Sequence, residues 1–357
     1  MSQQPIITFL IPVYHVNLND FAVCLASIRT QSILNKIDYE ILIVVDGQQE
    51  NLDILSSSLI QGQDLRLIVQ QHAGEAVARN RGIEEAHGKY LIFVDADDCL
   101  DPNAAERLVG AAQKHDADAA FANHSRIVGN TKIPIRYFTN QDYCNSKEVL
   151  LKHILSVGTD QGTVWAKLFS VKYLRLHKLQ FKKQLVNGVD QEFMVRFALT
   201  RPSVAIIPDD VYLYKYNTNS VVRKYDPRYS EKVLNTVNEI ELDLKHEKAI
   251  VESVYQLYLC DRILLCLMNY VFNPAANISF SERREHYREL LDNSKYSNAL
   301  RKANFSELDL PRRIVLQCCR MRWFAPVWLI TRLRQVEKRT LDRQVTKQTH
   351  NEELWSV

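Results

Sequence analysis

Apolar and polar residues alternate in blocks along the first 125 positions, and the blocks predict strands and helices in turn. Four short, almost continuously apolar runs are typical of strands buried on both faces: Ile6–Val13, Tyr39–Val45, Leu65–Val69 and Tyr90–Val94. Helical periodicity separates them, first in the face formed by Phe21, Leu25 and Ile28 and later in Glu75–Ala86. This alternation favours an α/β fold with a mostly parallel sheet and helices on both faces.

The pattern changes in the second half of the chain. From about residue 130 the predicted elements become short, and Val211–Tyr216 is the last run that predicts a strand. Beyond Asp226-Pro227 the periodicity is helical throughout. We therefore expect two domains, residues 1–226 with the α/β sheet and residues 227–357 as a helical C-terminal domain.

The composition is that of a folded protein, with 46% hydrophobic and 24% charged residues among 357. A formal net charge of +3 is too small for a chain that coats nucleic acid, so no nucleic-acid partner is expected. The seven cysteines are odd in number and form no CxxC pair, which favours a reducing, cytoplasmic compartment. No 18 apolar residues run together, so no membrane-spanning helix is expected.

Polar side chains follow the predicted strands at the point where each strand ends. Tyr14, Asp46 and Asp95 occupy such positions, and ligands of parallel sheets bind beyond the carboxyl ends of the strands. In the segment DADD at 95–98, Asp95 and Asp97 point the same way in an extended chain and can face one site. Paired carboxylates suit Mg²⁺ or Mn²⁺ bound to substrate phosphates. The other interpretation is an acidic turn before the next helix, for which Asp101 is the expected N-cap.

Three segments in a fixed order carry a resemblance to a known family: PVYHVN at 12–17, EILIVVDG at 40–47 and GEAVARNRGIEEAHGKYLIFVDADD at 74–98. They strongly resemble the inverting family 2 glycosyltransferases of bacterial cell-surface polysaccharide synthesis, closely over residues 5–125 and in patches to about 222. The resemblance implies a GT-A fold. It also implies transfer of one sugar from a nucleotide sugar, a UDP-sugar, to a glycan or lipid-linked acceptor with Mn²⁺ or Mg²⁺. Such an enzyme would work in the cytoplasm, at the inner face of the cell membrane.

The same resemblance assigns the donor site residue by residue. The turn Pro12-Val13-Tyr14 and the strand-end Asp46 would hold the base and the ribose of the nucleotide. Arg79 of the ARN segment would approach the nucleotide. Within Asp95-Ala96-Asp97, Asp95 would contact the ribose or a metal-bound water, and Asp97 would ligate the metal under the diphosphate.

Two downstream segments resemble the family's catalytic and acceptor regions. In NGVDQEF at 187–193, Asp190 matches the usual catalytic base, and Glu192 is the alternative base. An inverting transfer needs one carboxylate to take the proton of the acceptor hydroxyl. A helix N-terminus lowers the pKa of such a carboxylate, so we expect Asp190 to be ionised, although a simple helix cap is the other interpretation. In VWAKLF at 164–169, Trp165 and Lys167 are acceptor candidates, and core packing is the other interpretation of Trp165.

The segment 311–345 concentrates basic charge, with nine Arg or Lys residues against two acids, a local +7. Apolar residues are interleaved with this charge: Val315, Leu316, Cys318, Trp323, Phe324, Val327, Trp328, Leu329 and Ile330. Basic and aromatic residues without a spanning run predict a helix lying at an anionic membrane surface. The alternatives are a nucleic-acid arm and a solvated basic helix whose apolar stripe faces the core.

Two other classes of function fit parts of this pattern. A nucleotidyltransferase that makes sugar nucleotides also uses such a sheet with acidic metal ligands, but its Gly-rich basic phosphate loop has no counterpart in residues 12–20. A non-catalytic scaffold at the membrane surface would explain why Val45 and Val189 stand where acidic residues are usual. Turnover of a UDP-sugar separates the scaffold from the transferase.

Overall fold

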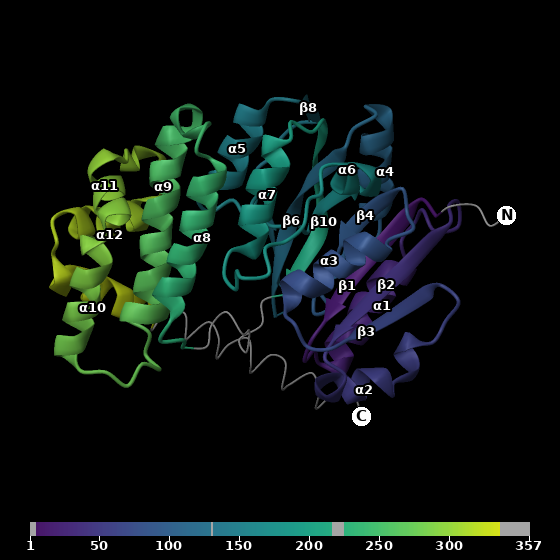
Figure 1. The fold of residues 1–357 in the computed structure, drawn as a ribbon, viewed down its shortest axis with the longest axis horizontal. Helices are drawn as coiled ribbons and strands as arrows, with labels where there is room; N and C mark the ends of the chain where they lie inside the picture. Colours follow the sequence, from purple (N-terminus) through teal and green to yellow (C-terminus); the bar gives the residue numbers. More distant parts are fainter. Residues whose placement is uncertain (1–4, 130, 216–224, 336–357) are drawn as a thin grey trace. The chain divides into compact units, whose positions relative to one another are not determined.

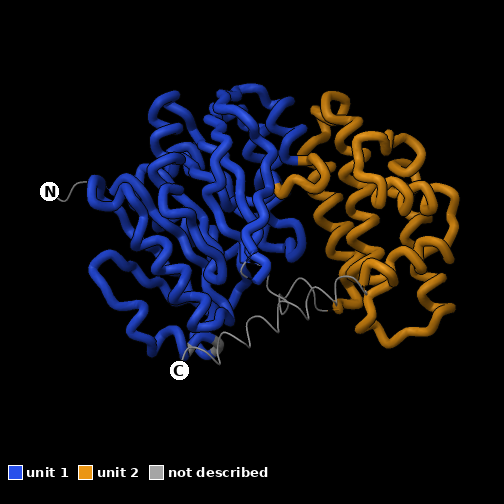
Figure 2. Tube along the Cα trace, turned by 180° about the vertical axis from the view of Figure 1, so that it is seen from behind, with its two compact units in different colours: residues 1–154, 161–216 blue, residues 155–160, 217–357 orange. Residues whose placement is uncertain are grey.

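The computed structural model describes residues 5–129, 131–215 and 225–335 (Figure 1). Contacts divide the chain into two compact units, the first comprising Met1–Ile154 with Gln161–Tyr216 and the second Leu155–Asp160 with Asn217–Val357 (Figure 2). The second unit thus begins before the Asp226-Pro227 pair, and it also takes in the loop 155–160.

One mixed sheet forms the centre of the first unit, with the strand order β3-β2-β1-β4-β9-β6-β10-β5. The strands on this path are β1 (Ile7–Val13), β2 (Tyr39–Asp46), β3 (Leu65–Gln70), β4 (Tyr90–Phe93), β5 (Cys99–Leu100), β6 (Ala119–Val128), β9 (Lys167–Ser170) and β10 (Val204–Lys215). Two short strands extend it, β7 (Thr131–Ile135) beside β6 and β8 (Asp142–Cys144) beside β10. The four strands expected near the N-terminus pair in parallel, while β9 runs antiparallel to both β4 and β6.

Helices lie between the strands in sequence, as the alternation predicts. They are α1 (Leu18–Arg29), α2 (Leu52–Leu55), α3 (Glu75–Glu85), α4 (Ala104–Lys114), α5 (Lys147–Leu155), α6 (Val171–Leu176) and α7 (Val189–Leu199). The helix α3 packs on β1 and β2, and α4 packs on β6 and β10. The helix α4 begins later than expected, because Asn103 and not Asp101 is its N-cap; Asp101 instead accepts a hydrogen bond from the backbone N–H of Asn103.

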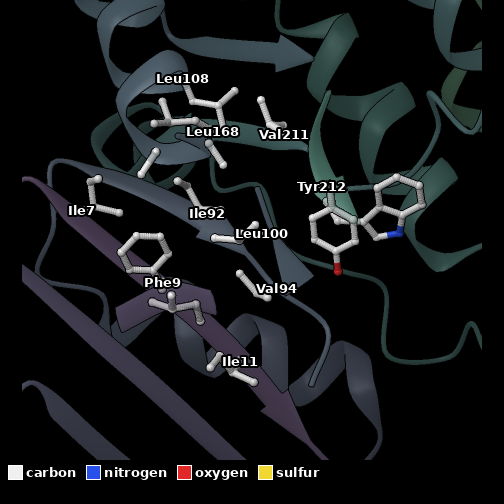
Figure 3. Packing of buried hydrophobic residues seen from close by; sticks show 14 of the residues in the cluster. Ile7, Phe9, Ile11, Ile92, Val94, Leu100, Leu108, Leu168, Val211 and Tyr212 are labelled. Carbon is white, nitrogen blue, oxygen red and sulfur yellow. The ribbon is translucent and has the colours of Figure 1, made fainter. Parts of the chain in front are cut away.

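The middle strands are buried on both faces, which explains their unbroken apolar sequences. Figure 3 shows Phe9 and Ile11 of β1 and Ile92 of β4 in one apolar layer that continues to Leu100 and Tyr212. All five side chains are at most 3% exposed. Full burial of a side chain such as Phe or Ile contributes about 1.5–3 kcal/mol, so this layer stabilises the strand order that sets the site.

Close packing also fixes the position of α3 on the sheet. A Cβ atom at Gly82 would lie 2.2 Å from the Leu10 side chain of β1, so glycine lets the helix approach the strand directly. Arg79 lies on the same helix, nearer its N-terminus, and the short helix–strand distance holds Arg79 close to the sheet.

Apart from the loop 155–160, the described part of the second unit is residues 225–335 and is mainly helical, which confirms the expected helical C-terminal region. Its elements are α8 (Tyr229–Asp243), α9 (Lys248–Cys266) with a π-helical turn (Leu267–Val271), α10 (Phe280–Asp292), α11 (Ser294–Lys302), α12 (Leu310–Arg320) and a helical run over 324–335. The long helix α9 contacts α8, α10, α11 and α12, and its Tyr255, Tyr258 and Ile263 are fully buried.

Two further findings concern the lengths of the helices and the state of the cysteines. Across the described ranges, every helix is too short or too polar to cross a lipid bilayer. All seven cysteines lie in the described part as free thiols, and six of them are buried. The six buried cysteines therefore contribute to packing.

Candidate active site

The carboxyl ends of β1, β2 and β4 lie at the same edge of the sheet, because these strands are parallel neighbours. Tyr14 follows β1, Asp46 ends β2, and Asp95 follows β4, so the candidate residues of the N-terminal half gather at this edge. The helix α7, which comes about 95 residues after Asp95 in sequence, adds Asp190 to the same place.

Arg79 is the centre of the site. Its side chain is only 3% exposed, and its guanidinium binds three carboxylates. It lies 2.6 Å from Glu75 Oε1, donates to Asp95 Oδ1 at 2.9 Å, and donates to Asp190 Oδ1. The expected donor-side residue Asp95 and the expected base Asp190 therefore share one cation. The ring of Phe181 lies beneath the guanidinium, 5.5 Å away.

Asp190 is the second residue of α7 and does not cap the helix. The N-cap is Gly188, whose φ of 70° lies in the left-handed region that glycine adopts without strain. The second oxygen of Asp190 accepts a hydrogen bond from the backbone N–H of Val164 at 3.3 Å. Burial raises the pKa of Asp190, Arg79 opposes that rise, and Asp95 adds to it. Burial thus outweighs the helix N-terminus, contrary to the expected low pKa, and a raised pKa makes the carboxylate a better proton acceptor.

The three acids after β4 have different environments. Asp98 is 1% exposed and accepts hydrogen bonds from the Tyr212 hydroxyl at 2.9 Å and the Lys215 backbone N–H at 2.7 Å. The Tyr212 hydroxyl also accepts from the Asp95 N–H at 3.1 Å, so β10 holds the acidic turn in place. Asp95 and Asp97 remain partly exposed at the site. Ala96 is buried, so only its backbone is available there.

The donor set of Asp95 and Asp97 fits a divalent cation. Burial and the neighbouring charge of Asp95 raise the pKa of Asp97, which shows two carboxylates repelling each other in a confined space. No group of three or more metal-ligating side chains occurs among the residues with described positions. Two carboxylates completed by phosphate and water oxygens are the set that Mg²⁺ and Mn²⁺ take at nucleotide sites.

At the other end of the edge, Asp46 has a structural role that its assignment to the nucleotide did not foresee. Its side chain is 3% exposed. Its two oxygens accept from Gln70 Nε2 and from the backbone N–H groups of Ala73 and Gly74, all at 2.8–2.9 Å. His72 Nδ1 also lies 2.9 Å from this carboxylate, so both of its oxygens already have partners from residues 70–74. Asp46 instead shapes the loop 70–74.

That loop presents His72, a residue that sequence reasoning missed. The His72 ring stacks on Tyr14 with centroids 4.3 Å apart and planes 16° from parallel. Both rings are about half exposed, which leaves aromatic faces open beside the strand ends. Of the other two residues of the expected turn, Val13 is buried and can supply only its backbone, while Pro12 is partly exposed. His72 lies just after the parallel strand β3, and this position was the sequence signal that could have identified it.

The two acceptor candidates of the VWAKLF segment belong to the core and do not line a sugar site. Trp165 is 7% exposed and stacks on Tyr212 and Tyr214 at 4.9 and 5.9 Å. Lys167 is 1% exposed, and its ammonium donates to the Trp165 carbonyl at 3.4 Å. Lys167 still acts on the site through its charge, which opposes the rise in the pKa of Asp190.

The alternative base, Glu192, is also excluded by its surroundings. Its side chain is fully buried and pairs with Lys182 at 2.9 Å and Arg196 at 2.5 Å. A carboxylate between two cations is a poor proton acceptor, and burial keeps it from any acceptor hydroxyl. Glu192 therefore holds the segment before α7 to the helix.

Replacement of Trp165 by alanine is expected to lower the free energy of unfolding by about 3–5 kcal/mol, the usual cost of truncating a buried tryptophan. Urea unfolding followed by circular dichroism measures this change. Trp323→Ala is the matched control, because Trp323 is 54% exposed and its loss should change stability little. A Trp165→Ala variant that keeps its stability and loses only acceptor binding would restore the sugar-stacking role.

Comparison with known proteins identifies the family of the chain. The family model described as "Glycosyl transferase family 2" matches residues 8–172, which contain Arg79, Asp95 and Asp97. The putative glycosyltransferase EpsH of Bacillus subtilis (strain 168) is 24% identical over 326 residues, which are 90% of this chain and 93% of EpsH. The glycosyltransferase GlyG of Streptococcus pneumoniae serotype 4 is 30% identical over 230 residues, which are 61% of this chain and 73% of GlyG.

A solved structure shares the fold. The crystal structure of S. aureus TarS 1–349 in complex with UDP-GlcNAc matches with a TM-score of 0.63 at 15% identity, over 92% of each chain. The likeness confirms the expected GT-A fold. The identity to GlyG over nearly three quarters of that protein confirms the resemblance seen in the sequence. This chain therefore belongs to glycosyltransferase family 2 and is a glycosyltransferase.

Proposed function

We propose that this enzyme transfers a single sugar from a UDP-sugar to a hydroxyl of a glycan or lipid-linked acceptor, with inversion, in the synthesis of a cell-surface polysaccharide. The observation that carries the proposal is the meeting of Asp95 and Asp190 on Arg79. One carboxylate belongs to the acidic turn that fits a metal and a diphosphate, and the other has the raised pKa of a proton acceptor. The UDP-GlcNAc bound in the TarS crystal structure supports UDP as the nucleotide.

The donor would lie along the carboxyl edge of the sheet. At one end, the exposed faces of Tyr14 and His72 suit stacking of a nucleobase. At the other end, Asp97 and Asp95 would hold Mn²⁺ or Mg²⁺. The cation would supply positive charge to the diphosphate leaving group. Asp95 has one oxygen on Arg79, so its orientation is set before any donor binds.

The acceptor hydroxyl would meet Asp190. In an inverting transfer the hydroxyl oxygen attacks the anomeric carbon as the bond to the diphosphate breaks, and the carboxylate takes the hydroxyl proton. The Val164 N–H and Arg79 fix the direction of the Asp190 carboxylate. Arg79 also lies between the donor-side and acceptor-side carboxylates, so one guanidinium positions both reacting partners. Such preorganisation lowers the cost of reaching the transition state.

The same proposal places the enzyme in the cytoplasm, at the inner face of the cell membrane. Nucleotide sugars are water-soluble, whereas a lipid-linked acceptor stays in the bilayer. The enzyme would therefore meet its two substrates at the membrane surface.

A panel of nucleotide sugars, each with and without Mn²⁺, tests the proposal by thermal shift, because a specific donor raises the melting temperature by mass action. We expect one or a few UDP-sugars to raise it, and only when Mn²⁺ is present. Release of UDP from that donor then distinguishes a transferase from a non-catalytic scaffold. Stabilisation by other nucleotides alone, or no UDP release with any acceptor, would reject the proposal.

Tyr14→Ala and His72→Ala should each weaken UDP binding about 5- to 150-fold, since base–aromatic stacking contributes about 1–3 kcal/mol. Isothermal titration with UDP and Mn²⁺ measures the effect. Tyr143→Ala is the matched control, because Tyr143 is also exposed and also stacks on a histidine, His115, away from the strand ends. Equal affinities for UDP in all three variants would show that the nucleobase does not stack on Tyr14 and His72.

A further inference from the structure

The second unit has a surface that the transfer reaction does not use. Two hollows of about 670 and 650 Å³ adjoin at Trp323, which lines both. Phe280 lines the first hollow, and Leu310, Ile314 and Met321 line the second. These residues come from α10, from α12 and from the turn that follows α12. We call the surface of the two hollows the Trp323 face.

The Trp323 face exposes large apolar side chains next to one another. Trp323 is 54% exposed, Phe280 55%, Leu310 64%, Met321 51% and Ile314 45%. Single exposed apolar residues are common on proteins, but a contiguous group of this size marks an interaction surface. The apolar side chains alone would favour any hydrophobic partner.

Charge narrows the choice of partner. Five arginines line the two hollows, namely Arg284, Arg288, Arg313, Arg320 and Arg322. Asp292, which is paired with Arg322, is the only acid among the described lining residues, so the face carries five positive charges against one negative charge, a net +4. The side chains of Arg284, Arg288 and Arg313 have no ion pair within the described ranges and are free to bind an external anion.

The combination excludes two other occupants on physical grounds. A second copy packed symmetrically on this face would set arginines against arginines, which is unfavourable. A soluble polyanion would pair with the arginines but would leave Leu310, Ile314 and Met321 in water. An anionic bilayer satisfies both sets, because apolar side chains enter the acyl boundary while arginine side chains extend to lipid phosphates.

We propose that the Trp323 face docks this enzyme onto anionic phospholipid headgroups at the membrane surface. The proposal deepens the proposed function, since docking would bring the enzyme to a lipid-linked acceptor. It differs from the docking helix that the sequence predicts over 311–345. Val315, Leu316, Cys318 and Val327 of that apolar stripe are core residues, at most 9% exposed, and residues 336–345 lie outside the described part of the chain.

The burial of these residues also decides how docking is tested. Deletion from residue 311 onward would remove core side chains of the second unit, so loss of vesicle binding after deletion would be uninformative. Point substitutions at exposed positions keep the core intact. The test therefore uses the full chain with two groups of substitutions, one of charged and one of apolar residues.

The first group is Arg284→Gln, Arg288→Gln and Arg313→Gln combined. Its matched control is Lys114→Gln, Lys172→Gln and Lys183→Gln combined, three exposed lysines of the first unit that give the same change in charge. Sedimentation with phosphatidylcholine vesicles, with and without phosphatidylglycerol, measures binding at low salt. We expect the parent to bind only vesicles that contain phosphatidylglycerol, and the arginine variant to bind them about 100-fold more weakly. The lysine control should bind like the parent.

The second group, Met321→Ser with Trp323→Ser, separates a membrane from a polyanion. We expect it to weaken vesicle binding and to leave binding to heparin, a soluble polyanion, unchanged. Vesicle binding equal to that of the parent would overturn the proposal in favour of a polyanion site. A parent that ignores anionic vesicles, or one that forms a dimer which this variant makes monomeric, would also overturn it.

Docking and transfer can fail separately. Asp190→Asn should bind vesicles like the parent, because Asp190 belongs to the first unit. The arginine variant should keep its transfer rate with a soluble acceptor fragment and lose rate only with an acceptor in vesicles. If the parent transferred sugar to neither acceptor, the proposed function would be rejected, while the result on vesicle docking would be unaffected.

Discussion

Asp190→Asn should bind the UDP-sugar donor nearly as tightly as the parent enzyme and transfer the sugar about 10²–10⁴-fold more slowly, the range typical for loss of a general base. Asparagine keeps the shape of the side chain, and its single oxygen can accept from either Arg79 or the Val164 N–H, but it cannot take a proton from the acceptor hydroxyl. Transfer measured at saturating donor, together with donor affinity from titration, separates the two effects. A transfer rate close to that of the parent would show that another group is the base.

The matched control is Glu192→Gln, two residues along the same helix. Glu192 is buried between Lys182 and Arg196, so its neutralisation removes the negative charge that both cations face and should lower the melting temperature. The transfer rate per folded molecule should change little. If Glu192→Gln instead abolished transfer in a stable protein, Glu192 and not Asp190 would be the catalytic base.

The pH profile gives a second measurement of the same residue. A base acts when it is deprotonated, so activity falls as the pH drops through its pKa. Because burial raises the pKa of Asp190, the acidic limb of the parent's rate should lie above the value of about 3.9 for an ordinary aspartate. The residual rate of Asp190→Asn should lack this limb.

Asp97→Asn should abolish the dependence of donor binding on Mn²⁺. The variant would lose one of two carboxylates that hold the cation under the diphosphate, so affinity with Mn²⁺ should fall to the value measured without it. The melting temperature should not fall, because burial and Asp95 raise the pKa of Asp97 and make its charge unfavourable in the free protein. Calorimetric titration of the UDP-sugar with and without Mn²⁺ measures the effect.

Asp98→Asn is the control for this experiment. Asp98 accepts hydrogen bonds from Tyr212 and from the Lys215 backbone, and asparagine can satisfy only one of the two donors with its single oxygen. We expect a lower melting temperature with Mn²⁺-dependent binding retained. If the Asp97→Asn variant bound Mn²⁺ and donor as tightly as the parent, Asp97 would not be a ligand of the metal.

Most of the first sheet could be predicted from local pattern, whereas Arg79 at the centre of the site was predicted from the resemblance to the family. The strands β1 to β4 are short apolar runs because helices cover both faces, and a parallel arrangement then requires their carboxyl ends to meet. That argument alone brings Tyr14 and Asp95 to one edge. It does not identify the partners of each side chain. The resemblance to the family assigned Asp46 to the nucleotide, whereas in the structure its carboxylate accepts hydrogen bonds from the backbone of the loop 70–74.

The sequence by itself therefore determined the family, the α/β architecture and the position of the acidic turn, since all three depend on residues close together in the chain. Only the tertiary structure decided which carboxylate is available for chemistry. Asp190 reaches Arg79 across 111 residues, while Glu192, two residues further along the same helix, is buried between two cations. The pKa and exposure of a side chain depend on its neighbours in space, and the pattern of a segment does not contain those neighbours. For the same reason, only the structure shows that Val315, Leu316, Cys318 and Val327 of the expected stripe over 311–345 are buried, and the docking that we propose therefore uses the exposed Trp323 face.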